Sequence, residues 1–349
     1  MMPSYDAFCD EVEQIEEYMS NINIYNQILE MDLSKLDVDY KNKLHEFKCA
    51  NDQFNKRKYD YTVIIISLYG CFEQLIENFI KDYLMIVVDD CKYYSKMPQI
   101  IRDNHIDLSI SLMGKIEQPK YSAFLTKEQI ICNLHDCIQN DMCNLNYEAF
   151  CQHTANFRIQ TIEEVLKNVG LTTVISKIKK NDELKKIYKE EHGDCKYEQL
   201  KHSLVFSFLD DLADRRNCIA HGSVSDILSY ELQKQMITKV KIFAQELDRI
   251  GFEIVLPYLV KKSYKINRIY NPNEKNKLLC FELVEEQINV GDFIIRKLND
   301  QYTYSTIKSI EINHVRYQRY NSVKNTEIGI MLDKNRKLNE EYWLYHPNR

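Results

Sequence analysis

Residues 63–84 read VIIISLYGCFEQLIENFIKDYL, and this stretch sets the fold class of the amino-terminal part of the chain. Its apolar side chains recur at steps of three and four residues. They are Ile65, Leu68, Phe72, Leu75, Ile76, Phe79 and Tyr83. That spacing places them on a single stripe of an α-helix. The pattern therefore predicts a helix over residues 60–86 that is buried along one side.

The same stretch is not expected to cross a membrane. Its most apolar run, from Val63 to Phe72, is ten residues long before Glu73 and Glu77 interrupt it. A membrane-spanning helix needs about 20 apolar residues. The first residues of the chain are acidic and do not resemble a secretion signal. We therefore expect a cytoplasmic protein without a membrane partner, in which the eleven cysteines are reduced.

The charge balance limits the kind of partner that the chain can have. Residues 1–254 carry 30 Lys and Arg against 41 Asp and Glu, a net charge of −11, whereas residues 255–349 carry 16 against 11, a net charge of +5. Proteins dedicated to duplex DNA usually present a strongly basic face. Any contact with nucleic acid is therefore expected to be local.

Helical spacing continues through residues 1–254. Gly (8) and Pro (6) are scarce in the whole chain, which favours long helices. The capping sequence Thr126-Lys-Glu-Gln129 predicts the start of a helix over 127–139. Residues 87–125 and 175–195 are interpreted as polar connections. We expect an all-α helical bundle over residues 1–254.

The pattern changes after residue 254. Residues 255–277 are polar and basic, and we interpret them as a linker. From residue 278 onward the periodicity becomes two, in segments rich in β-branched and aromatic residues and separated by Gly, Asn and Asp. These segments are 278–284, 292–298, 302–315, 327–333 and 342–346. They predict a small β-barrel over 278–349, so the expected fold class is α+β with two domains.

A polar stretch at residues 214–222, DRRNCIAHG, follows an apolar helical stripe that ends at Leu212. An arginine placed on such a stripe must be paired, face a groove, or face another subunit. One interpretation is structural, and in it an arginine pairs with one of the nearby carboxylates, Asp210, Asp211 or Asp214. The other interpretation is a functional site.

The residues of this stretch resemble the R-N-x-x-x-H motif of the HEPN superfamily. Arg216 and Asn217 fit the motif together with His221, and Arg215 fits with one more residue in the spacing. The helix at 63–84 and the segment HTANFRIQTIEEVLKNVGL (153–171) strengthen the likeness. It covers about residues 40–250 and is nearest to the prokaryotic MAE-type branch of the superfamily.

The resemblance implies a helical-bundle homodimer in which the motifs of both subunits line one cleft. It implies a metal-independent endoribonuclease of a bacterial toxin or antiphage defence system, with no cofactor. Arg216, Asn217 and His221 would be the catalytic residues, with Arg215 and Glu73 as secondary candidates. RNA, including tRNA, would be the substrate, and a regulator from the same operon is a further expected partner.

Two alternatives from other functional classes remain open at this point. The helical part can be a non-catalytic module that dimerises and binds RNA or a protein partner. It can also be an antitoxin-like subunit. The intact motif favours the nuclease, and the acidic net charge of residues 1–254 favours a binding module.

The carboxy-terminal segment resembles the small β-barrel of the second domain of translation factors. The likeness rests on Val290-Gly-Asp292 and on the later segment EIGIMLD (327–333). Cations interleaved with tyrosines are typical of surfaces that bind single-stranded RNA. The predicted RNA-binding cations are Lys297, Lys308, Arg316 and Arg319. The alternative is the ordinary surface of a small domain.

A cluster of potential zinc ligands lies between residues 132 and 153. The cluster consists of Cys132, His135, Cys137, Cys143, Cys151 and His153. Its spacing is irregular and contains no C-x-x-C pair, which zinc sites commonly use. Free, partly buried cysteines are the favoured interpretation, and no metal is predicted.

Overall fold

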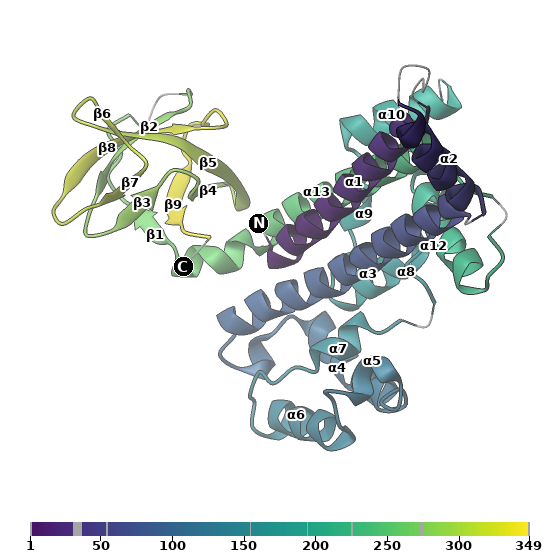
Figure 1. Ribbon diagram of the computed structural model, residues 1–349. Helices are drawn as coiled ribbons and strands as arrows, with labels where there is room; N and C mark the ends of the chain where they lie inside the picture. The colour runs from purple at the N-terminus through teal and green to yellow at the C-terminus, as the bar shows by residue number, and fades with distance from the viewer. Residues whose placement is uncertain are drawn as a thin grey trace. The chain divides into compact units, whose positions relative to one another are not determined.

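The structure is a computed structural model, and it describes residues 2–30, 37–53, 55–153, 155–193, 195–224, 226–271 and 275–347. The chain divides into two compact units. One contains residues 2–84 and 97–248, and the other contains residues 85–96 together with residues 249 onward. The first unit is helical, and an antiparallel β-sheet makes up most of the second (Figure 1). The predicted α+β fold class is confirmed.

The α-helices that the structure describes all lie before residue 260 (Figure 1). They are α1 (Pro3–Glu30), α2 (Val38–Gln53), α3 (Lys56–Asp90), α4 (Gln99–Met113), α5 (Pro119–Ser122), α6 (Lys127–Gln139), α7 (Tyr147–Cys151), α8 (Ile159–Asn168), α9 (Val174–Ile178), α10 (Asp182–His192), α11 (His202–Val205), α12 (Ser207–Ala220) and α13 (Tyr230–Leu259). The capping box at Thr126 is present at the start of α6.

Two segments predicted as polar connections contain helices instead. Residues 87–125 include α4 and α5, and residues 175–195 include most of α9 and all of α10. Helices α5 and α10 each bury a single side chain, Tyr121 and Leu184, and α4 leaves several of its apolar side chains exposed. In α4 the fully buried side chains include Ile101 and Leu112. The prediction failed because so narrow an apolar stripe is hard to distinguish from a connection.

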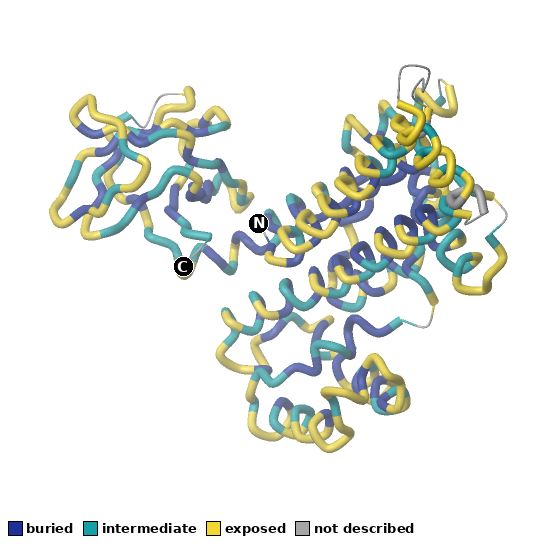
Figure 2. The backbone as a smooth tube through the Cα atoms, viewed as in Figure 1, coloured by how far each residue is buried: buried dark blue, intermediate teal, exposed yellow. Residues whose placement is uncertain are grey.

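Helix α3 is the centre of the helical unit. Of the seven residues in its predicted apolar stripe, none is more than 5% exposed. Phe72 packs edge-to-face on Phe243 of α13, with the ring centroids 5.8 Å apart. In Figure 1 this helix runs between α1 and α13 on one side and α4 and α7 on the other. Figure 2 shows a line of buried positions along its length.

Length and composition alone would allow α3 to cross a membrane. An 18-residue window of this helix has a mean hydropathy of 1.4, but 56% of that window is buried inside the protein. Its charged residues also contact neighbouring elements, as in the 3.5 Å ion pair between Lys81 and Glu148 of α7. In this structure α3 is a core helix, and the core helices of soluble proteins are commonly as long and as apolar as this one.

The second unit is built on antiparallel strands. They are β1 (Tyr264–Ile266), β2 (Leu278–Leu283), β3 (Gln287–Asn289), β4 (Phe293–Leu298), β5 (Gln301–Ile312), β6 (Val315–Tyr317), β7 (Arg319–Asn321), β8 (Thr326–Leu332) and β9 (Glu341–Tyr345). The main sheet has the order β1-β9-β4-β5-β8-β2, with β6 paired to β5, and β3 pairs with β7. The main sheet forms a half-barrel around a core that includes Phe281, Ile294 and Ile310.

The five predicted strands correspond to β2, β4, β5, β8 and β9. The segment predicted as a linker, residues 255–277, contains more structure than expected. Helix α13 continues into it as far as Leu259, and β1 pairs with β9 inside the main sheet. Phe252 of α13 packs on Phe293 of β4, with ring centroids 5.1 Å apart. Val255 and Leu256 are fully buried as well, and their burial explains why the helix extends beyond residue 254.

A buried ion pair lies in the sheet unit. The guanidinium of Arg296 donates to Oε1 of Glu340 at 2.6 Å, and the two side chains are 4% and 2% exposed. Arg296 also donates to the hydroxyl of Ser305 at 2.8 Å and to the carbonyl oxygen of Asn335 at 2.9 Å. These bonds satisfy a charge that would otherwise be costly to bury.

Replacing Glu340 by Ala is expected to lower the free energy of unfolding by about 3–5 kcal/mol, because it leaves a buried guanidinium unpaired. Urea unfolding followed by the fluorescence of Trp343, the one tryptophan of the chain, measures this loss in the same sheet. Glu341→Ala is the matched control, since Glu341 pairs with Lys265 where both side chains are about half exposed, and should cost less than about 1 kcal/mol. Equal losses in the two variants would contradict the prediction.

Candidate functional site

The polar motif lies at the carboxy-terminal end of α12. The helix ends at Ala220, His221 is its capping residue, and Gly222 has a φ of 72°. That left-handed conformation favours glycine and reverses the chain there. His221 is consequently exposed at the end of the helix.

The two adjacent arginines of the motif have different surroundings. Arg215 is bound on several sides and its side chain is only 15% exposed. Its Nε donates to Asp211 at 2.9 Å, and its Nη1 donates to the hydroxyl of Tyr61 at 3.0 Å and to the carbonyl oxygen of Asp226 at 3.1 Å. Arg215 therefore ties α12 both to α3 and to the segment that follows the motif.

Arg216 instead faces the polar flank of α3. Its guanidinium carbon lies 5.5 Å from the centroid of the Tyr69 ring, a cation–π contact, and its Nη1 lies 3.5 Å from Oδ1 of Asn217. Burial raises the pKa of Tyr69 to about 12, so this phenol is neutral near pH 7. Among the residues that the structure describes, no carboxylate lies within ion-pair distance of Arg216.

Asn217 is held by the loop that precedes α8. Nδ2 of Asn156 donates to Oδ1 of Asn217 at 2.6 Å. The next residue in the loop, Phe157, donates its backbone N–H to the hydroxyl of Tyr69 at 2.9 Å. These two bonds join the loop to both α12 and α3, so the side chain of Asn217 is oriented from outside its own helix.

The three carboxylates near the motif all have other partners. Oδ1 of Asp210 accepts from the backbone N–H of Ile159 at the start of α8, and Asp211 accepts from Arg215. Asp214 forms a two-pronged ion pair with Arg158, with one of the N–O distances at 3.2 Å. The structural interpretation therefore holds for Arg215 but not for Arg216.

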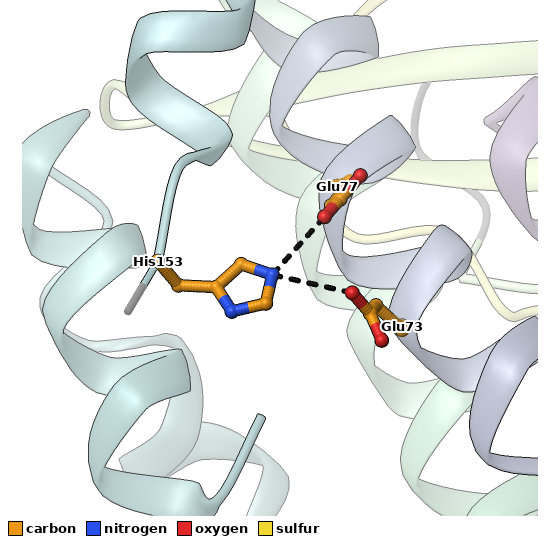
Figure 3. A group of neighbouring side chains, drawn as sticks. All are labelled: Glu73, Glu77 and His153. Atoms are coloured by element: carbon orange, nitrogen blue, oxygen red, sulfur yellow. Dashed lines mark hydrogen bonds and ion pairs between the residues drawn. The ribbon is translucent and has the colours of Figure 1, made fainter. Parts of the chain in front are cut away.

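A second polar group lies on the same flank of α3, one and two turns beyond Tyr69. Figure 3 shows Glu73 and Glu77 directed at the imidazole of His153 from the loop before α8. Nε2 of His153 is 3.2 Å from Oε1 of Glu77 and 3.4 Å from Oε1 of Glu73. Lys120 of α5 is hydrogen-bonded to Glu77 and lies 3.6 Å from Glu73.

The charges of this group depend on one another. Burial alone would lower the pKa of His153, but its hydrogen bonds to Glu73 and Glu77 outweigh that effect and raise the pKa to about 9. The hydrogen bond from His153 in turn lowers the pKa of Glu73, and the charges of Lys120 and Arg216 lower it further. Glu73 thus links this group electrostatically to the motif.

The other predicted ligands and binding residues do not form one site. Lys297 lies opposite Tyr302 near one end of β5, whereas Arg316 lies opposite Glu311 near the other end. The two positions on β5 are nine residues apart along the chain. Lys308 is exposed on β5. Arg319 lies on β7, outside the main sheet, and donates to Gln287 at 2.7 Å.

The cysteines near residue 140 are free thiols rather than a ligand cluster. Cys137 and Cys151 are buried, and each donates to a backbone carbonyl oxygen. Within the described ranges, the group of side chains placed to hold a metal ion is Glu73, Glu77 and His153, whose ligand atoms lie within 4.8 Å of one another.

Sequence reasoning missed the contributions of Glu77, Lys120, His153 and Asn156 to this region. The four-residue step from Glu73 to Glu77 is a visible signal, because it places both carboxylates on one helix face. The loop residues lie in the segment 153–171 that carries the family likeness, but the sequence gives no signal for their contact partners. His153 is 76 residues from Glu77 along the chain, and Asn156 is 61 residues from Asn217.

Comparison with known proteins adds one finding. A family model described as RiboL-PSP-HEPN matches residues 31–250, which is more than half of the 349-residue chain. The match includes α3, the loop before α8, and all of α12, and therefore every residue of the two polar groups described above. No curated protein matches the chain with significant similarity.

The unequal burial of the two arginines predicts unequal effects on stability. Replacing Arg215 by Ala should lower the free energy of unfolding by about 2–3 kcal/mol, because Tyr61 and two acidic residues lose their shared donor. Replacing Arg216 by Ala should cost about 1 kcal/mol or less. Urea unfolding followed by circular dichroism compares the two variants, and a larger loss for Arg216→Ala would contradict the assignment.

Proposed function

We propose that this chain, which belongs to the RiboL-PSP-HEPN family, is an endoribonuclease that cleaves RNA without a metal ion at the site of Arg216, Asn217 and His221. HEPN domains are RNases or RNA-binding modules, and they often dimerise. The proposal concerns which of these activities the chain has and which residues carry it.

One observation carries the proposal: Arg216 is a half-buried cation that the surrounding carboxylates do not neutralise. Asp210, Asp211 and Asp214 are all near it in sequence, and all three are bound to other groups. A guanidinium in this state is available for an anion from outside the subunit. A phosphodiester suits its planar set of donors, which can bind two phosphate oxygens at once.

The chemistry that we propose needs only protein groups. The ribose 2′-oxygen attacks the adjacent phosphorus, the bond from phosphorus to the 5′-oxygen breaks, and the products are a 2′,3′-cyclic phosphate and a 5′-hydroxyl. A histidine accepts the 2′-hydroxyl proton, and a second histidine donates a proton to the leaving 5′-oxygen. In a homodimer, His221 of each subunit supplies one of these two groups.

Each motif residue has a distinct role in this scheme. Arg216 binds the scissile phosphate and stabilises the charge that builds on its oxygens. Asn217, oriented by Asn156, positions the phosphate or the imidazole. Arg215 holds α12 in place and does not touch RNA, while Glu73 acts on Arg216 through its charge.

The wider context belongs to the same proposal. We place the protein in the cytoplasm, as a toxin or antiphage effector controlled by a partner from the same operon. A closer kinship with the MAE-type branch, and a likeness of the sheet unit to the second domain of translation factors, stay predictions. The net charge of −11 over residues 1–254 favours one alternative, a non-catalytic module that reaches RNA through a protein partner.

The proposal predicts that the purified protein cleaves RNA in the presence of EDTA. His221→Ala should lower the rate about 10²–10⁴-fold, because the proton transfer is lost. Arg216→Ala should lower it by a comparable factor. The assay uses total tRNA and a long single-stranded RNA, and analysis of the product ends should find 2′,3′-cyclic phosphates.

The matched control is His135→Ala, because His135 is an exposed histidine on α6 outside the motif. It should keep the wild-type rate. Equal residual cleavage by wild type and His221→Ala would identify a contaminating nuclease and remove His221 from the mechanism. RNA binding without cleavage by the wild type would favour the binding module.

A further inference from the structure

We propose that Glu73, Glu77 and His153 form a binding site for one divalent transition-metal ion, with zinc as the preferred ion. The site lies on the flank of α3 that faces the loop before α8 (Figure 3). It is separate from the chemistry proposed for Arg216 and His221, which needs no metal.

Two of the three distances between ligand atoms already suit a tetrahedral ion, and all three atoms lie within 4.8 Å of one another. Nε2 of His153 lies 3.2 Å from one carboxylate oxygen and 3.4 Å from the other. Zinc binds nitrogen and oxygen ligands at about 2.0–2.2 Å, so two ligands in a tetrahedral arrangement are about 3.3–3.6 Å apart. Little movement of these side chains is needed to accept the ion.

The imidazole of His153 is also oriented as a metal ligand requires. Its Nδ1 lies 2.6 Å from the backbone carbonyl oxygen of Ala155, which can only accept a hydrogen bond. Nδ1 of His153 therefore carries a hydrogen, and Nε2 points at Glu73 and Glu77. Metal-binding histidines almost always have this second contact, which fixes the ring and the tautomer.

Two carboxylates face Nε2 of His153, so a positively charged group has to lie between Nε2 and their oxygens. Ionised carboxylates only accept hydrogen bonds, so a neutral Nε2 with its lone pair toward them would be repelled. Either a proton or a metal ion must lie between Nε2 and the two oxygens. The side chains of His153 and Glu77 are each 12% exposed, and that of Glu73 is 26% exposed, so an ion can still reach them from solvent.

Lys120 is the competitor for the same carboxylates. Its ammonium group is hydrogen-bonded to Glu77 and close to Glu73, but its side chain is 41% exposed and belongs to the four-residue helix α5. With Lys120 in place and His153 protonated, two positive charges balance two carboxylates. A divalent ion with neutral His153 gives the same balance and releases Lys120 into solvent, so metal binding is an exchange of cations.

Metal binding would hold the loop before α8 against α3. The loop residue Asn156 orients Asn217 of the motif through a hydrogen bond of 2.6 Å. The metal site would therefore be structural with respect to the motif, because it fixes the loop and takes no part in proton transfer. One tetrahedral position would remain for water.

The test is calorimetric titration of the full chain with zinc, after treatment with EDTA and removal of the chelator. Accessible cysteines are first alkylated, because free thiols bind zinc themselves. The wild type should bind one ion, and His153→Gln and Glu77→Gln should each weaken binding about 100-fold or more, since each removes a ligand. Cobalt in place of zinc should give visible absorption without a thiolate charge-transfer band.

Two further variants distinguish the metal site from an ion-pair network alone. Lys120→Met should bind zinc about 10-fold more tightly, because it removes the competing cation, a change that unfolding cannot produce. Glu148→Gln, which removes the ion-pair partner of Lys81 nearby on α7, should leave the affinity unchanged.

The proposal is overturned if the wild type binds no zinc, if binding survives both ligand substitutions, or if it disappears when the cysteines are alkylated. It is also overturned if Lys120→Met fails to tighten binding, since the four side chains would then be an ion-pair network only. No RNA is present in the titration, so its outcome is independent of whether the chain is a nuclease.

Discussion

The burial of α3 is the constraint on which the rest of the helical unit depends. One side of this helix is packed in the core, with residues such as Leu68, Phe72 and Ile76 fully buried. The neighbouring flank, about 100° round the helix, is thereby fixed in direction and carries polar residues one turn apart. Tyr69 meets the motif helix, and Glu73 and Glu77 meet the loop before α8. The apolar core thus positions the polar groups without contributing to their chemistry.

The distribution of carboxylates around α12 decides what its arginines do. Three aspartates lie within seven residues of Arg216, and a charge count alone would neutralise both arginines of the motif. In the folded chain one of these aspartates binds Arg215, another binds Arg158, and the third accepts a hydrogen bond from the first turn of α8. Arg216 pairs with none of these three aspartates, whereas Arg215 is bound to Asp211, and the charge of Arg216 acts on Glu73 by lowering its pKa. This asymmetry is what makes the region suitable for an anionic ligand.

Much of the fold could be predicted from the sequence because its signals are local. The stripe in α3, the capping box at Thr126 and the period-two strands each depend on residues a few positions apart. Helix α10 was missed because it buries only Leu184, and α4 was missed because polar residues, His105 and Ser109, occupy two of its four buried positions. In the candidate site, the spacing of Arg216, Asn217 and His221 was visible, but it fits Arg215 almost equally well. The contacts that separate the two arginines include those with Tyr61 and Tyr69, which are far away in sequence.

Two contacts that hold α12 in place also restrict how this motif can vary in evolution. Arg215 binds α3 on one side of the helix and Arg158 binds Asp214 on another, so the helix cannot turn about its axis. Inserting one residue before the motif would rotate the following residues by about 100°, so that Arg215 would stand where Arg216 now stands and Arg216 where Asn217 now stands. Variation in length is therefore poorly tolerated on the arginine side of the motif.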